Sequence, residues 1–295
     1  MATKKSRAVP APGKKYSAKP PAKLLSAVSD MALPDRSRLD ALYELGAQSA
    51  FTRDTFDTVA AVLRDRGESL EVRNQALSTL QAASFDPSSF APFKRAYVEV
   101  LREMCTDPEL DLRQRAFGIL SREGDLETQA MLLTGLEFPS DALLPPEKAL
   151  QLLSNDQHGG AYAVARKIAQ DPPNDLARRE ALRVLAADAQ SIELFERVLL
   201  DKSEPEQVRQ LAASSLNQLA PQKLQACARQ IAVDANESDD MKSLGLTALT
   251  HFGDARQLAS DQGLHDMVDA AQAKALDGGS TLAGAATKFK KRYGG

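Results

Sequence analysis

The sequence predicts an all-α protein, namely an α-α superhelical solenoid of about seven helical hairpins with disordered basic termini. Three observations predict this fold. Helix-forming residues dominate, with 47 Ala and 40 Leu among 295 residues, whereas aromatic residues make up 5% and Trp is absent. A motif with fixed internal spacing recurs along the chain. Charge is divided between an acidic body and two basic ends.

The recurring motif starts at a slot that is basic in six of its seven copies. Three positions after the slot the residue is Ala in six copies and Gly in one, and seven positions after it the residue is always Leu. These offsets lie on one face of a helix, so each copy predicts a slot helix with an apolar stripe. The slots are spaced 31 to 40 residues apart: Arg38, Arg73, Arg113, Pro146, Arg178, Arg209 and Lys242.

A second amphipathic segment separates successive slot helices, so each repeat is predicted to be a helical hairpin. One hairpin cannot bury its apolar face alone, whereas a stack of hairpins can. The predicted second segments, called outer helices below, are residues 51–66, 90–104, 126–136, 161–169, 192–200 and 223–233.

Turns with proline and acidic residues precede several slots, and residues 107–113 show the pattern best. Together with the repeat, these turns resemble the HEAT repeat family, in particular the short bacterial repeats of phycobilin-lyase type. The resemblance covers roughly residues 24–275, and the fourth repeat departs from it, with Pro146 in the slot and a long loop at 137–144. It implies a ladder of ion pairs, which would join Asp107 to Arg113, Asp171 to Arg178 and Asp201 to Arg209.

Charge and composition predict three parts: a disordered basic arm (1–23), a HEAT-like α-solenoid (24–276) and a flexible basic C-terminal tail (277–295). Residues 1–29 and 278–295 hold eleven basic residues and no acid, which leaves 26 basic and 40 acidic residues, a net charge of −14, in the rest of the chain. Basic tails suit weak binding to RNA or an anionic membrane. The residues predicted to bind such a polyanion are Lys4, Lys5, Arg7, Lys14, Lys15, Lys290, Lys291 and Arg292.

The sequence predicts no catalytic group, metal site or cofactor. Its three histidines have no partner at metal-ligand spacing, and no glycine-rich phosphate loop follows a strand. Within the family it resembles, deoxyhypusine hydroxylase binds iron through repeated His-Glu pairs, which this sequence lacks. Cys105 and Cys227 fall inside amphipathic segments and predict buried thiols in a reducing compartment, the cytoplasm. No apolar run is long enough for a transmembrane helix.

The resemblance implies that the slot helices line the concave face of the solenoid. Offsets one and five from each slot point away from the apolar stripe, and they carry mainly amides and hydroxyls. Such groups suit hydrogen bonding to a peptide or a folded protein. A cationic rung at 179 and 183 would meet an acidic group of the partner, unless it pairs with Glu180 or Asp188 on its own surface. The predicted partner-binding residues are Asn74, Ser78, Gln114, Gln151, Arg179, Arg183, Gln210 and Ser214.

The predicted function is that of a non-catalytic scaffold or adaptor that binds another protein on the concave face. Two alternatives stay open: a bilin-lyase-type enzyme or accessory factor, and a nucleic-acid-associated protein that acts through its basic tails. An apolar pocket between neighbouring repeats would favour the lyase, and a broad groove lined by the residues above would favour the scaffold. HEAT-like DNA glycosylases use a cationic face with Trp, which an acidic body without Trp does not match.

Overall fold

A computed structural model of the chain describes residues 22–47, 51–154, 160–274 and 281–293. In these residues the regular structure is entirely helical, which confirms the predicted all-α fold. The helices form two compact units, one that ends at Thr128 and one that begins at Gln129, a boundary that the sequence analysis does not place. The division falls inside α8 (Leu126–Glu137).

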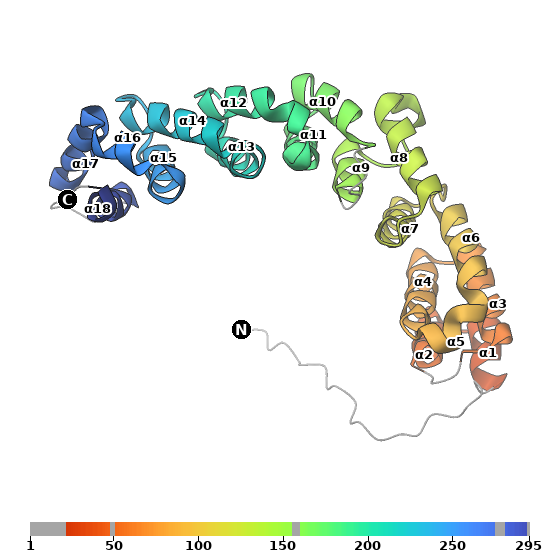
Figure 1. Cartoon of the computed structure of the whole chain (residues 1–295). Coiled ribbons are helices and arrows are strands. Elements are labelled where there is room, and N and C mark those ends of the chain that lie inside the picture. The colour runs from red at the N-terminus through yellow and green to blue at the C-terminus, as the bar shows by residue number, and fades with distance from the viewer. Residues whose placement is uncertain (1–21, 48–50, 155–159, 275–280, 294–295) are drawn as a thin grey trace, which may run out of the picture. The chain divides into compact units, whose positions relative to one another are not determined.

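In the first unit, slot helices and outer helices form two layers (Figure 1). The slot helices are α2 (Asp35–Gly46), α4 (Leu70–Ser84) and α7 (Leu110–Arg122). The other layer contains α1 (Ala22–Ser29), α3 (Arg53–Arg64), α5 (Pro87–Phe90), a 3₁₀ turn (Ala91–Phe93) and α6 (Lys94–Met104).

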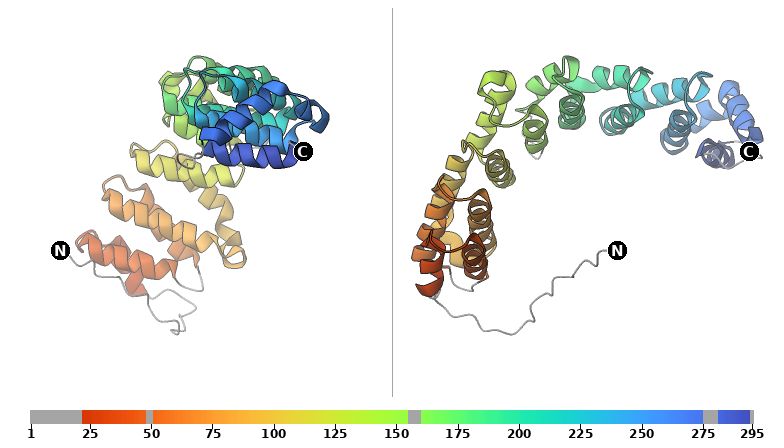
Figure 2. Two further views of the ribbon diagram at one scale, coloured as in Figure 1. Left: turned by 90° about the vertical axis from the view of Figure 1, so that its left-hand side faces the viewer. Right: turned by 180° about the vertical axis from the view of Figure 1, so that it is seen from behind.

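The second unit repeats this arrangement, with its slot helices in one row and its outer helices in another (Figures 1 and 2). The slot helices are α9 (Pro146–Leu153), α11 (Asp175–Val184), α13 (Glu206–Leu219) and α15 (Asp239–Phe252). The outer helices are α10 (Tyr162–Gln170), α12 (Ile192–Leu200), α14 (Pro221–Val233), α16 (Ala255–Ala259) and α17 (Gln262–Lys274). Short 3₁₀ turns lie at Pro139–Asp141, Leu185–Ala187 and Ala189–Ser191. All six predicted outer segments are helical, which confirms the hairpin repeat.

The apolar stripe forms the core of both units. Each of the seven leucines at offset seven exposes 3% or less of its surface, so the predicted register is confirmed. The small residue at offset three lets the neighbouring helix approach closely. At Gly245 the approach is so close that an added Cβ would lie 2.7 Å from the carbonyl oxygen of Ala228.

The slot arginine is buried in three repeats and partly buried in two others, and in four of these five it joins two neighbouring hairpins. Arg209 donates from Nε to the carbonyl oxygen of Leu199 (2.8 Å), at the end of α12. Its terminal nitrogens donate to both carboxylate oxygens of Glu237 (2.9 and 2.6 Å), just before α15. Arg38 binds the Val28 carbonyl and Glu68 in the same way, and Arg178 binds the Ala169 carbonyl and Glu204. Each guanidinium therefore caps one outer helix and holds the turn that leads into the next slot helix.

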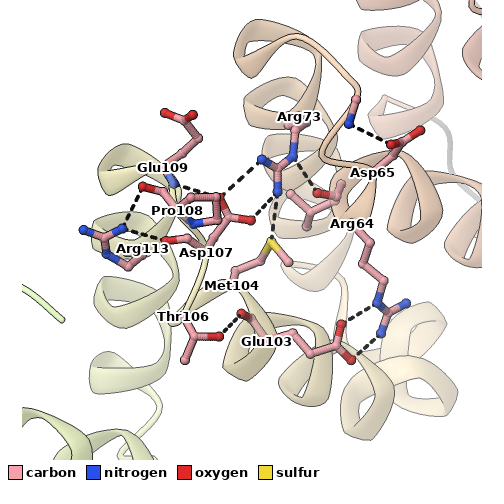
Figure 3. A network of polar contacts seen from close by, with 12 residues as sticks. Arg64, Asp65, Arg73, Glu103, Met104, Thr106, Asp107, Pro108, Glu109 and Arg113 are labelled. Carbon is pink, nitrogen blue, oxygen red and sulfur yellow. Dashed lines mark hydrogen bonds and ion pairs between the residues drawn. The ribbon is translucent and has the colours of Figure 1, made fainter. Parts of the chain in front are cut away.

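The ladder expected within each repeat is wrong, because the ion pairs cross to the next repeat. Asp107 pairs with Arg73 of the preceding repeat, and Arg113 donates to the carbonyl oxygens of Asp107 (2.6 Å) and Pro108 (2.9 Å) (Figure 3). Likewise, the carboxylates that bind Arg178 and Arg209 are Glu204 and Glu237 instead of Asp171 and Asp201.

At Asp201 the reason is that this aspartate shapes its own turn. The carboxylate of Asp201 accepts hydrogen bonds from the backbone N–H (2.9 Å) and hydroxyl (2.6 Å) of Ser203. The slot arginine instead extends towards the following repeat. There it binds a second acid, Glu204 or Glu237, which lies just before the next slot helix.

The predicted flexible tail at 277–295 is wrong for residues 281–293, which form α18 (Thr281–Tyr293). Leu282, Ala285, Ala286 and Phe289 of this helix are buried against α15 and α17. They occupy offsets zero, three, four and seven, so α18 is an eighth slot helix. Its slot residue is the apolar Leu282 and its last stripe residue is Phe289, so the sequence motif does not identify this copy. Residues 277–280 and 294–295 lie outside the described residues, as does the predicted basic arm except Ala22 and Lys23, which begin α1.

The Arg209–Glu237 pair predicts a loss of stability in acid. Hydrogen bonds from Arg209 lower the pKa of Glu237, while burial acts in the opposite direction. A carboxylate with a depressed folded-state pKa stabilises the protein above its unfolded pKa, about 4.3, and loses this effect as the pH falls through the folded value. Glu237→Gln is therefore expected to lower the free energy of unfolding at pH 7 by about 1–3 kcal/mol and to flatten its decline towards pH ~3. Urea denaturation across this pH range measures both effects.

Glu193→Gln, a substitution at an exposed position of α12, is the matched control and should alter neither quantity. An unchanged acid profile for Glu237→Gln would mean that this pair does not stabilise the fold.

The position of Phe289 in the core predicts that the last helix stabilises the second unit. Phe289→Ala removes a fully buried ring and should cost about 3–5 kcal/mol, whereas Lys288→Ala, at the neighbouring exposed position, should cost less than about 0.5 kcal/mol. Urea denaturation of the full chain checks both values. Equal stability of the two variants would show that α18 does not pack as described.

Candidate binding grooves on the slot helices

The predicted partner-binding residues all lie on slot helices, at the face turned away from the stripe. Four of them are exposed: Gln151, Arg183, Gln210 and Ser214. The other four are partly buried: Asn74, Ser78, Gln114 and Arg179. We call this surface the slot-helix face. Its role in binding stays a prediction, but two grooves, one in each unit, gather several of these residues.

In the second unit, a groove of about 480 Å³ runs along α15 from Asp240 to Phe252, beside α13. The start of α18 closes one end, where the Thr281 hydroxyl donates to Asp240 (2.9 Å) and Ser243 donates to the Thr281 carbonyl (3.3 Å). The remaining lining combines apolar side chains with amides and hydroxyls: Gln210, Ala213, Ser214, Asn217, Leu224, Leu244, Thr247, Ala248 and His251. We call it the α13–α15 groove.

Aromatic and amide groups give the α13–α15 groove unused binding capacity. Phe252 is 47% exposed, and its ring centroid lies 6.1 Å from that of His251. The side-chain oxygen of Asn217 is buried and accepts no hydrogen bond from the described residues. The described residues of the lining include neither Lys nor Arg, so they do not suit a phosphate.

In the first unit, a groove of about 940 Å³ runs along α2 and α4 and receives one side chain from α7. It brings together two predicted residues, Asn74 and Ser78, with Tyr43, which is 65% exposed. The other lining residues are Asp35, Arg36, Leu39, Asp40, Glu71, Gln75 and Arg115. We call it the α2–α4 groove.

Arg115 is the functional candidate that the sequence analysis missed. Its Nη1 donates to the backbone oxygen and the side-chain oxygen of Asn74 (both 2.8 Å), and its Nη2 donates to the Ser78 hydroxyl (2.9 Å). Burial lowers the pKa of this guanidinium. Arg115 lies at offset two, between the stripe and the face defined by offsets one and five. Its long side chain nevertheless reaches the neighbouring slot helix α4.

The cationic rung of the second unit is partly neutralised by an acid on its own helix. Arg183 donates to Glu180 (2.7 Å), and the Nε of Arg179 lies 3.9 Å from the same carboxylate. Asp188, the other acid considered for this pairing, binds Arg166 instead. The rung therefore offers less net charge to a partner than its sequence indicates.

Three of the predicted polyanion-binding residues, Lys290, Lys291 and Arg292, lie in the last turn of α18. A basic residue there is favoured by the negative end of the helix dipole. Lys290 pairs with Asp269 (2.7 Å), and Arg292 lies 5.6 Å from the ring centroid of Tyr293. The other five predicted residues, Lys4, Lys5, Arg7, Lys14 and Lys15, lie outside the described residues.

The remaining reactive side chains offer little chemistry. Cys105 and Cys227 are buried, and burial raises the pKa of Cys105 to about 12 and that of Cys227 above its ordinary value, so both are protonated at neutral pH. The His265 ring contacts the Leu258 carbonyl oxygen (3.1 Å), and His158 lies outside the described residues. The described part of the chain holds no group of three or more His, Cys, Asp or Glu side chains placed to bind a metal ion. No helix in the described ranges is long and apolar enough to cross a membrane.

Comparison with known proteins gives remote structural likenesses only. No family model and no curated protein matches the chain. Human deoxyhypusine hydroxylase in complex with glycerol is 15% identical, with a TM-score of 0.35 over 81% of this chain and 96% of that one. The complex of CpcE and CpcF of phycocyanin lyase from Nostoc sp. PCC7120 is 16% identical, with a TM-score of 0.38 over 90% of this chain and 97% of that one. At these values neither likeness carries an argument about what this protein binds or does.

Proposed function

We propose that this protein is a non-catalytic interaction scaffold that binds an apolar segment of a partner protein in the α13–α15 groove. The observation that carries the proposal is the exposed ring of Phe252 at the end of an apolar groove with amide and hydroxyl walls. Exposed aromatic side chains supply large contact area, and they are enriched where proteins bind proteins.

The walls of the groove suit a peptide better than a phosphate or an ion. Gln210, Ser214, Ser243 and Thr247 supply donors and acceptors that can meet backbone N–H and C=O groups of a bound segment. The amide oxygen of Asn217 adds an acceptor that no described residue uses. A segment with apolar side chains would cover Leu244, Ala248 and Phe252 while its backbone bonds to the walls.

The apolar lining of the α13–α15 groove is the feature that would favour a lyase, but the predicted residues Gln210 and Ser214 also line it, and its charge gives the alternatives less support. A bilin carries propionate carboxylates, and the described lining of the α13–α15 groove has no Lys or Arg to receive them. Binding of nucleic acid would depend on the basic ends, and most of those residues lie outside the described part of the chain. Both remain outcomes of the experiment below.

Blocking the groove tests the proposal. Thr247→Arg places a long, charged side chain in an exposed groove position and should reduce capture of the partner by about tenfold or more. Glu193→Arg introduces the same side chain on exposed α12 and should leave capture unchanged. The measurement is quantitative affinity capture with the full chain, combined with photo-crosslinking from position 247 and, as control, position 193.

A protein that crosslinks at 247 and is lost from Thr247→Arg would support the proposal. Equal capture by both variants would contradict it, and recovery of a bilin or of RNA, instead of a protein, would favour the corresponding alternative.

A further inference from the structure

We propose that the first unit carries a second binding site, the α2–α4 groove, in which Arg115 anchors a carboxylate of a peptide segment whose flanking residues are basic. This site shares no lining residue with the α13–α15 groove, so it can be tested independently of the function proposed for that groove.

Arg115 differs from the other buried or partly buried arginines of the repeats. Arg38, Arg73, Arg178 and Arg209 each face a carboxylate of the same unit. Arg115 has no acid within ion-pair distance among the described residues, and within them it donates hydrogen bonds to the neutral groups of Asn74 and Ser78. Asp111, one turn earlier on α7, attracts this charge only from beyond ion-pair distance, so the guanidinium is partly buried without an acid in direct contact among the described residues.

An uncompensated charge of this kind is costly, and an incoming anion would relieve the cost. The three hydrogen bonds from Arg115 to α4 also hold the planar guanidinium in place before a ligand arrives. A guanidinium held in this way offers a carboxylate a charge-assisted bond with little loss of side-chain entropy. The burial that lowers the pKa of Arg115 is the same burial that would strengthen this bond.

The rest of the groove selects against a polyanion. Asp35, Asp40 and Glu71 line it, while Arg36 is the one further cation among the described residues of the lining. These acids would repel RNA or a run of acidic residues, but they would attract Lys or Arg on either side of one carboxylate. Exposed Tyr43 adds an aromatic face that can receive such a cation. The complementary ligand is therefore a peptide with one acid between basic residues.

The size and course of the groove fit such a segment. It extends from the first turns of α2 and α4, at Asp35 and Glu71, to Tyr43 and Ser78 two turns later. Its volume of about 940 Å³ lies at the upper end of cavities that enclose drug-sized ligands, which is enough for several side chains.

An array of short synthetic peptides tests the proposal with the full chain. One series places a single Asp among Lys and Leu residues, and matched series replace that Asp by Asn, contain only Lys and Leu, or contain only Asp and Leu. The wild-type protein should prefer the Asp-among-Lys series by about tenfold over its Asn counterpart. Arg115→Gln should lose this preference. Arg122→Gln, an exposed arginine on the same helix outside the groove lining, should keep it.

Several results would overturn the proposal: no preference for the Asp-among-Lys series in the wild type, an equal preference in Arg115→Gln, or stronger binding of the all-Asp series. If Arg115→Gln does not fold, as judged by circular dichroism, the Asp-to-Asn comparison with wild-type protein decides alone. Thr247→Arg should bind the array like the wild type, so failure of the α13–α15 groove and failure of this site can be told apart.

Discussion

The buried slot arginine is the interaction on which the repeat structure depends. A guanidinium can donate to a carbonyl through Nε and to a carboxylate through its two terminal nitrogens at once, as Arg209 does. Lysine cannot do so, and at Lys242 the ammonium donates to the Ala235 carbonyl oxygen (3.3 Å) on the surface, with no carboxylate of the described residues within ion-pair distance. Because the arginine takes one partner from the preceding outer helix and one from the following turn, it fixes three successive helices together. Loss of either partner would leave a buried group unpaired, which would destabilise the junction between the two hairpins.

The candidate binding sites follow from this constraint. The stripe residues and the slot arginines turn one side of each slot helix into the core, so the opposite side is left to solvent in every repeat. Neighbouring slot helices then leave grooves between them. The charge and polarity of each groove depend on residues that do not belong to the buried core. In the second unit these residues are amides, hydroxyls and Phe252, and in the first they are acids, Tyr43 and Arg115. The two grooves therefore suit different partners although the same repeat builds both.

Periodicity predicts the elements well, because burial of the stripe depends on spacing within a single helix. It predicts the partners of the slot arginines poorly, since the acid that binds Arg73 lies 34 residues further on, beyond an entire hairpin. The last slot helix is not predicted because its motif differs from the earlier copies. Leu282 stands in place of the basic slot residue and Phe289 in place of the leucine at offset seven, and both are buried. The role of Arg115 is not predicted either, because the length of its side chain, and not its position on the helix, brings it to Asn74 and Ser78. Long side chains and contacts between repeats are thus the part that only the three-dimensional structure supplies.

A double-mutant cycle on Arg73 and Asp107 tests most directly whether the slot arginine joins neighbouring repeats. Both side chains are almost fully buried, 3% and 1% exposed, and each has its partner on the adjacent hairpin. The free energy of unfolding is measured by urea denaturation for wild type, Arg73→Met, Asp107→Asn and the double variant. The account predicts that each single change costs about 3–5 kcal/mol and that the double change costs less than the sum, with a coupling of about 1–3 kcal/mol. Strictly additive costs would contradict it, because the two side chains would then stabilise their own repeats independently.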